Sequence, residues 1–269
     1  MENSSNGVPS GVLNIALDIG NTRCKFSVQN NIAHDWAVRR DIAHLDLHEG
    51  FLDAITRRVP SESRAVWWVA SVNHRALGEL QGWVAQNRPA DVVKILDYRT
   101  IPIRIDVDFP EKVGVDRLLA ALCANALRRE DAPAVVVDLG TALKVDLVSE
   151  SGIFLGGAIA PGLRMGAIAL EAQTSALPQL DVTPILEGMG TDDISSVGKN
   201  TLDALRAGLF WGMVGAVREI TSRTAARLKS PPDFFITGGG ASAIQKSLGD
   251  EFRFIEDMAM QGVFLAMQT

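Results

Sequence analysis

One short pattern occurs twice in this chain, at residues 17–22 and, 120 positions later, at residues 137–142. Each copy consists of apolar residues, then Asp-x-Gly, then small residues that lead into a second apolar run. Apolar runs on both sides of a tight glycine turn are typical of a β-hairpin. The repeat therefore predicts two similar domains, each opening with a hairpin, that face each other across a cleft.

The order of the expected elements indicates an α/β fold. Strands are expected at residues 12–17, 23–29, 32–38, 65–70, 92–96, 134–137, 143–148, 153–159 and 234–236. Helices are expected at residues 45–59, 74–87, 115–129, 161–171, 201–227, 242–248 and 258–266. The charged stretch 130–133 ends in proline and marks a boundary. We predict a disordered tail at residues 1–10 and two domains, at residues 11–130 and 131–269.

Charge and composition exclude several functions. The formal net charge is −6, whereas proteins that bind nucleic acid through its phosphates carry basic patches, so no nucleic-acid partner is expected. No apolar run approaches the ~20 residues of a membrane helix, and the polar N-terminus lacks the apolar part of a signal peptide, so no membrane partner is expected. Cys24 and Cys123 form no C-x-x-C pair, which favours a reduced, cytoplasmic setting.

The first turn, Asp18-Ile19-Gly20-Asn21-Thr22, has the residues of an anion site. Glycine permits a positive φ and a close approach of the backbone to a ligand, and successive N–H groups bind phosphate. Asp18 can hold Mg²⁺ or its water shell, and Lys25 can reach phosphate oxygens. For this motif alone, an ordinary hairpin with polar turn formers explains the residues equally well.

Two further turns strengthen the phosphate interpretation. The second turn, at residues 138–142, duplicates the first, and the two together could hold the phosphates of a nucleotide from both sides. A third turn, Thr237-Gly238-Gly239-Gly240, follows an expected strand and opens an expected helix, where N–H groups suit a phosphate. Glycine clusters often serve only as caps, but three such turns in one chain point to nucleotide binding.

Gly114-Val115-Asp116-Arg117 opens the helix expected at residues 115–129. The helix dipole alone would favour an acid here. In the functional interpretation, Asp116 accepts or orients the proton of a substrate hydroxyl, and Arg117 grips a carboxylate with its planar guanidinium group.

Two other segments have simple structural explanations. Residues 198–201 could cap the next helix through Asn200 or Thr201, and the glycines of residues 156–162 could allow close packing.

Together these motifs resemble those of the type III pantothenate kinases. Asp18-Ile19-Gly20-Asn21-Thr22-Arg23-Cys24-Lys25 resembles their Asp-x-Gly-Asn-Thr-x-x-Lys motif, and Pro110 with Gly114-Val115-Asp116-Arg117 resembles their Pro-x3-Gly-x-Asp-Arg motif. Residues 138–142, 156–162, 198–201 and 237–239 match further family motifs in order. The resemblance implies the fold of the actin, sugar-kinase and chaperone-ATPase superfamily, with two ribonuclease-H-like halves. It also implies ATP-dependent phosphorylation of the pantothenate 4′-hydroxyl, the first step of coenzyme A biosynthesis.

The resemblance also implies roles for single residues. ATP would be contacted by Asp18, Ile19, Gly20, Asn21, Thr22, Arg23, Cys24, Lys25 and Thr141. Pantothenate would be contacted by Gly114, Val115, Asp116, Arg117 and Thr201, with Asp116 as the base. Asp138 would help to bind a monovalent cation, K⁺ or NH4⁺, and Asp18 would bind Mg²⁺ directly or through water. The family is typically homodimeric.

Three residues depart from the family pattern, and two other functions stay open. Lys144 stands where many relatives have Thr, and its charge could alter or replace the monovalent cation. Val107 stands where relatives often have Tyr, and Ser175 replaces an Ala. The alternatives are a kinase of the same fold that acts on another small metabolite, and an accessory factor for gene expression.

Overall fold

The computed structural model describes residues 12–29, 42–46, 51–59 and 63–269. The tail predicted at residues 1–10 and the strand predicted at residues 32–38 lie outside them. The chain divides into two compact units: residues 1–102, 114–116 and 259–269 form the first, and residues 103–113 and 117–258 form the second. The boundary near residue 130, deduced from the charged stretch, stays a prediction.

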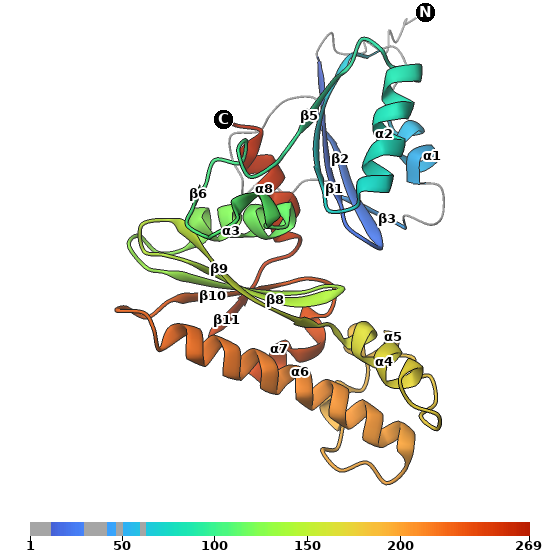
Figure 1. Cartoon of the computed structure of the whole chain (residues 1–269), viewed down its shortest axis with the longest axis vertical. Helices are drawn as coiled ribbons and strands as arrows, with labels where there is room; N and C mark the ends of the chain where they lie inside the picture. The colour runs from blue at the N-terminus through green and yellow to red at the C-terminus, as the bar shows by residue number, and fades with distance from the viewer. Residues whose placement is uncertain (1–11, 30–41, 47–50, 60–62) are drawn as a thin grey trace, which may run out of the picture. The chain divides into compact units, whose positions relative to one another are not determined.

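The first unit is built on a sheet with the strand order β3-β2-β1-β4-β5; four of these strands, β1, β2, β3 and β5, are labelled in Figure 1. Its strands are β1 (Leu13–Ile19), β2 (Arg23–Gln29), β3 (Ala43–Asp46), β4 (Ala65–Ser71) and β5 (Val92–Ile95). The central strand β1 pairs antiparallel with β2 and parallel with β4. The carboxyl ends of β1 and β4 therefore lie at the same edge, which is the edge that carries the first Asp-x-Gly turn.

The second unit repeats this topology. Its sheet has the order β11-β10-β7-β8-β9-β6. The strands are β6 (Arg104–Ile105), β7 (Ala134–Leu139), β8 (Ala142–Val148), β9 (Ile153–Pro161), β10 (Asp233–Thr237) and β11 (Phe252–Phe254). Here β7 takes the place of β1, because it pairs antiparallel with β8 and parallel with β10. With β6 set aside, the two sheets share one ribonuclease-H-like strand order.

Helices cover the sheets through their apolar faces. In the first unit, α1 (Phe51–Thr56) and α2 (His74–Asn87) pack against the strands, and this unit also contains α8 (Met258–Ala266) except for its first residue. In the second unit, the long α6 (Thr201–Ala225) and α7 (Ala241–Leu248) pack on buried valines of β7. The remaining helices are α3 (Val115–Leu127), α4 (Leu163–Ala172), α5 (Thr183–Leu186) and the 3-10 turns η1 (Pro110–Lys112) and η2 (Thr191–Asp193).

Most of the expected elements are confirmed, and one is wrong in part. A helix was expected at residues 45–59, but Leu45 lies in β3 and pairs with Cys24 of β2, while the helix α1 is limited to Phe51–Thr56. Pairing with a neighbouring strand outweighs the helical periodicity of the segment. The short elements β6, β11 and α5 were not expected. Among the described residues, no helix has the length and apolar character needed to cross a bilayer.

Candidate active site

The turn after β1 joins a paired acid and base to an exposed polar loop. Asp18 lies directly opposite Lys25 in the β1–β2 pairing, and the Lys25 Nζ atom is 3.5 Å from the Asp18 Oδ2 atom. Asp18 is 7% exposed, whereas Asn21 and Thr22 in the turn are exposed. The backbone of the turn is thus accessible while the carboxylate is held in place beneath it.

Two residues of the predicted nucleotide motif belong to the core. The side chains of Ile19 and Cys24 are fully buried, so any contact that they make with a ligand must come from their backbone atoms. Burial, with a smaller effect of the nearby Asp18 carboxylate, raises the pKa of the Cys24 thiol well above its usual range. This thiol is therefore a packing group rather than a nucleophile.

Gly20 does not use the positive φ that glycine permits. Gly20 is not among the residues with a left-handed backbone in the described chain. Its amide donates a hydrogen bond of 2.9 Å to the carbonyl oxygen of Arg23, and a Cβ atom on Gly20 would lie 3.1 Å from that oxygen. Glycine is favoured here by the tight closure of the turn, not by its φ angle.

The turn after β7 repeats this arrangement with a closer ion pair. Asp138 lies directly opposite Lys144 in the β7–β8 pairing, and the Lys144 Nζ atom is 2.6 Å from the Asp138 Oδ2 atom. The Gly140 amide donates to the Ala142 carbonyl oxygen at 3.2 Å. Thr141, predicted to contact ATP, is exposed at the tip of the turn.

The third glycine turn packs directly on the second. Gly238 has a φ of +95°, and a Cβ atom on it would lie 2.6 Å from the Asp138 Oδ1 atom. The Gly240 amide donates to the Leu139 carbonyl oxygen at 3.0 Å. A side chain at Gly238 would therefore be strained and would collide with Asp138. Two of the three turns predicted from the sequence thus meet at one strand edge of the second unit.

Arg117 contacts an acid that the sequence did not single out. Its Nε atom lies 3.0 Å from Oδ1 and 3.1 Å from Oδ2 of Asp146, and its Nη2 atom also donates to Oδ1. The two side chains are 13% and 4% exposed. The guanidinium group also lies 5.6 Å from the centre of the Phe154 ring. Asp146 thus fixes the orientation of a residue that was expected to grip the substrate.

A glycine makes room for this buried pair. Gly157 of β9 lies directly opposite Asp146 of β8, and a Cβ atom on Gly157 would lie 2.6 Å from the Asp146 Oδ1 atom. Close packing, the simpler explanation for the glycines of residues 156–162, is confirmed at this position. The combination of a lone acid in an apolar strand with a glycine-rich neighbouring strand is the sequence signal that could have pointed to Asp146.

Thr201 is the first residue of α6, which is capped by its neighbour. The Asn200 Oδ1 atom accepts a hydrogen bond of 2.9 Å from the Asp203 amide, so the predicted capping role falls to Asn200. Thr201 itself is exposed. Beside it, a cavity of about 640 Å³ is lined in part by Lys199, Asp203 and Arg206.

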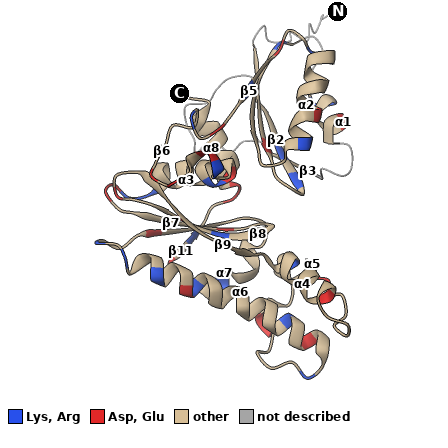
Figure 2. Cartoon of the chain, in the orientation of Figure 1, with Lys and Arg blue, Asp and Glu red and all other residues tan. Residues whose placement is uncertain are grey.

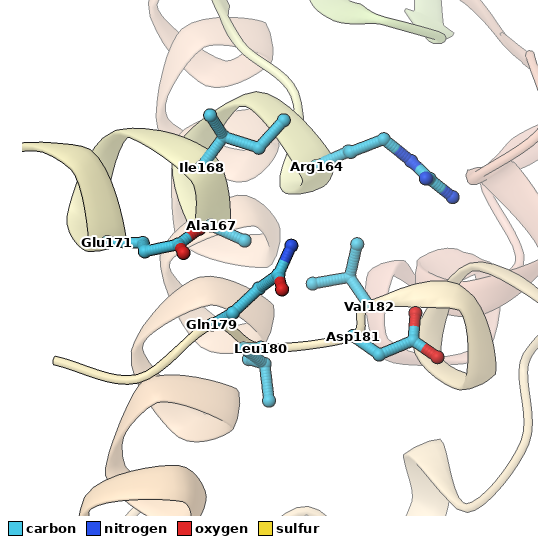
Figure 3. A pocket seen from close by; sticks show the side chains of 8 residues that line it. All are labelled: Arg164, Ala167, Ile168, Glu171, Gln179, Leu180, Asp181 and Val182. Atoms are coloured by element: carbon cyan, nitrogen blue, oxygen red, sulfur yellow. The ribbon is translucent and has the colours of Figure 1, made fainter.

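A second cavity, of about 340 Å³, contains none of the predicted site residues. It lies between α4 and the segment before α5, with Arg164 at one end and Glu171 at the other (Figure 3). Within the described part of the chain, no cluster of three or more His, Cys, Asp or Glu side chains could hold a metal ion.

By unit, the predicted residues fall into two groups. Residues 18–25 and 114–116 belong to the first unit, and Arg117, Asp138, Thr141 and Thr201 belong to the second. Asp116 and Arg117 are consecutive residues of α3. Each group therefore has its own Asp-x-Gly turn with an Asp–Lys pair at its base.

Comparisons with known proteins agree with these motifs. Residues 14–223 match the family model for type III pantothenate kinases. The chain is 33% identical to the type III pantothenate kinase of Parafrankia sp. (strain EAN1pec), over 86% of this chain and 88% of that protein. It is 32% identical to the type III pantothenate kinase of Frankia alni, over 86% of this chain and 89% of that protein.

A solved structure supports the fold. A protein of Sinorhizobium meliloti, named for a 2-dehydro-3-deoxygalactonokinase activity, superposes with a TM-score of 0.52 at 14% identity, over 94% of this chain and 95% of that chain. With the duplicated ribonuclease-H-like sheets, this shows the two-domain α/β fold of the sugar kinases and actin-like ATPases. Because the family match extends over most of the sequence and includes all the motifs from Asp18 to Thr201, this chain belongs to the type III pantothenate kinase family.

Proposed function

We propose that this protein transfers the γ-phosphoryl group of ATP to the 4′-hydroxyl of pantothenate, the first step of coenzyme A biosynthesis. The observation that carries the proposal is the family match over residues 14–223. The duplicated turns support it, because each offers an exposed polar loop with a fixed Asp–Lys pair beneath it. Phosphoryl transfer relies on positioning and charge neutralisation, which are the properties that such turns supply.

In this proposal the two turns bind the phosphates of ATP. Residues 18–25 contribute backbone N–H groups, the exposed side chains of Asn21 and Thr22, and the Lys25 ammonium group, and Thr141 contributes its exposed hydroxyl. Asp18 would hold Mg²⁺ through water, because Mg²⁺ keeps most of its hydration shell and needs only one or two carboxylates. The Lys25 ammonium group lies 3.5 Å from Asp18, farther than the 2.6 Å of the pair in the second unit, and it is assigned to the phosphates. When bound, Mg²⁺ supplies neutralisation of the phosphate charge.

The acceptor is served by residues at the start of α3 and α6. Asp116 accepts or orients the proton of the 4′-hydroxyl, while Arg117, with Gly114, Val115 and Thr201, binds the rest of pantothenate. Arg117 binds Asp146 through two of its nitrogens, and its positive charge is assigned to the pantothenate carboxylate. Asp146 then acts as a positioning residue for Arg117.

The residues around Asp138 do not fit the monovalent cation that the family implies. The carboxylate expected to bind it, Asp138, already has the Lys144 ammonium group at 2.6 Å. A free cation at Asp138 would meet a carboxylate whose charge is balanced and a second positive charge beside it. No step of the proposed reaction is assigned to K⁺ or NH4⁺.

The remaining parts of the proposal concern partners and location. A homodimer is proposed from the family pattern, and the exposed apolar residues Met165 and Ile168 on α4 would suit a protein contact. A nucleic-acid partner is not proposed, since acidic and basic residues are mixed along α6 rather than forming a basic stripe (Figure 2). A cytoplasmic location is proposed because ATP is the donor and both cysteines are free thiols.

A transfer assay tests the proposal. Radiolabelled ATP and Mg²⁺ should label pantothenate, and a panel of sugars, polyols and other carboxylic acids should be labelled far less. Pantothenate whose carboxylate is replaced by a neutral amide separates recognition of the carboxylate from recognition of the hydroxyl. The absence of transfer to pantothenate at saturating ATP, with transfer to another acceptor, would contradict the proposal and assign the protein a different substrate.

A further inference from the structure

The Asp138–Lys144 pair is built into the strand pairing. The two residues are directly opposite in the antiparallel β7–β8 ladder, so their side chains project from the same face of the sheet. The Asp138 side chain is 21% exposed and that of Lys144 is 14% exposed. Leu143 and Val145, which flank Lys144, are buried. The strand pairing therefore fixes the backbone positions from which the ammonium group contacts the carboxylate.

The carboxylate is also confined on its other side. The Gly238 turn approaches so closely that a Cβ atom there would lie 2.6 Å from the Asp138 Oδ1 atom. Lys144 meets the other oxygen, Oδ2. Asp138 thus lies between the glycine turn and the lysine.

The first unit carries the same pair in a looser form. Asp18 and Lys25 occupy the equivalent positions in the β1–β2 ladder, but their closest atoms are 3.5 Å apart, against 2.6 Å for Asp138 and Lys144. The same strand positions therefore place a lysine against the Asp of the Asp-x-Gly turn in both units. In the second unit the pair is at hydrogen-bonding distance.

From this arrangement we infer that the Lys144 ammonium group takes the place of the monovalent cation at Asp138, so that phosphoryl transfer needs neither K⁺ nor NH4⁺. The inference rests on the proposed function. An ammonium group has the same unit charge as either ion. Because it is attached to the chain, it is present at the carboxylate at every salt concentration, whereas a free ion binds only by mass action. A second cation beside it would be repelled.

The first test is on the unaltered protein. Transfer to pantothenate is measured at equal ionic strength in potassium, ammonium, sodium and tetramethylammonium chloride. The rates should agree within about twofold. Affinity for a non-hydrolysable ATP analogue, measured by calorimetry in the same salts, should also be unchanged. Stimulation of either quantity by about tenfold or more in K⁺ or NH4⁺ would overturn the inference.

Variants then test whether Lys144 is the reason that transfer and nucleotide binding do not depend on K⁺ or NH4⁺. Lys144→Thr removes the charge and opens space beside Asp138, and Lys144→Gln removes the charge with little change in size. Each variant should be weakened in tetramethylammonium chloride and restored at least in part by K⁺, in transfer and in analogue binding. Lys246→Thr is the matched control, because Lys246 also forms an Asp–Lys pair, with Asp192 at 2.8 Å, but lies on the exposed surface of α7. It should behave like the unaltered protein.

The outcomes separate the inference from the proposed function. If no salt supports transfer to pantothenate, the proposed function fails, and the salt dependence of analogue binding still decides the role of Lys144. If transfer occurs but depends on K⁺, the function stands and the inference fails. If Lys144→Thr does not fold, Lys144→Gln decides, and a folded Lys144→Gln that shows no response to K⁺ would also overturn the inference.

Discussion

At the residue scale, Asp116 has the clearest test. It lies in the first turn of α3, where a carboxylate is favoured by the helix dipole whatever its function. If it serves the acceptor hydroxyl, Asp116→Asn should lower kcat by far more than tenfold, which corresponds to about 1.4 kcal/mol of barrier. The affinity for ATP should be nearly unchanged, and steady-state kinetics with calorimetry would measure both.

Asparagine also tests the alternative role. It keeps the size of the side chain and still accepts hydrogen bonds, so a helix-start role would survive the change with little loss of stability. A variant that retains turnover within about tenfold would show that Asp116 is not the group that handles the proton.

Arg117 combines a structural role with a functional one. It forms a largely buried bidentate pair with Asp146, and removing one partner of such a pair leaves an unpaired charge that costs about 3–5 kcal/mol. Arg117→Ala should therefore lower the free energy of unfolding by an amount of that order and also raise the KM for pantothenate. Urea unfolding followed by circular dichroism would measure the first effect, and steady-state kinetics the second.

An exposed arginine provides the control. Arg99 also pairs with an aspartate, Asp97, but its side chain is 71% exposed, and such exposed pairs contribute little to stability because water screens them. Arg99→Ala should change neither stability nor KM appreciably. Equal losses of stability in the two variants would contradict the claim that burial makes the Arg117–Asp146 pair costly to break.

At the scale of single elements, the cap of α6 determines how Thr201 is presented. The Asn200 side chain accepts from the Asp203 amide at 2.9 Å, and loss of such a cap costs about 1 kcal/mol. Asn200→Ala should lower stability by that amount and raise the KM for pantothenate, since Thr201 follows directly. Thermal unfolding and kinetics would measure the two effects. Asn200→Ser, which keeps a capping oxygen, should restore both, and a variant that loses stability without any change in KM would remove Thr201 from the substrate site.

Elements defined by local signals could be predicted from the sequence. The strand β2 and the helix α2 have the predicted bounds, because each combines a clear apolar pattern with polar turn residues on both sides. The short strands β6 and β11 were not predicted, because two or three residues carry no periodicity and their pairing depends on distant partners. The Asp-x-Gly turns could therefore be predicted from local sequence, whereas the short strands β6 and β11 depend on pairing between distant segments.

The candidate site shows the same division. The repeated motif identified Asp18 and Asp138, and the cross-strand positions of Lys25 and Lys144 follow once the hairpin register is known. Asp146 was not predicted as a site residue, because its partner Arg117 is 29 positions away in the sequence. The local signal, a lone acid in an apolar strand beside a glycine-rich strand, marks Asp146 as unusual but does not identify Arg117 as its partner. Pairing of this kind is a property of the folded chain.

At the scale of the whole molecule, the proposed function predicts that nucleotide binding raises the free energy of unfolding. ATP with Mg²⁺ should bind the folded chain and not the unfolded one, so at a concentration about 100-fold above its Kd it should stabilise the protein by about 2.7 kcal/mol. The Tm should rise by several degrees, in differential scanning fluorimetry with a non-hydrolysable ATP analogue. Asp116→Asn should keep this shift in full, since its carboxylate is assigned to the acceptor. Lys25→Gln should reduce it, since the ammonium group is assigned to the phosphates. A shift that is lost in Asp116→Asn and kept in Lys25→Gln would exchange these two assignments and contradict the division of roles between the β1–β2 turn and the start of α3.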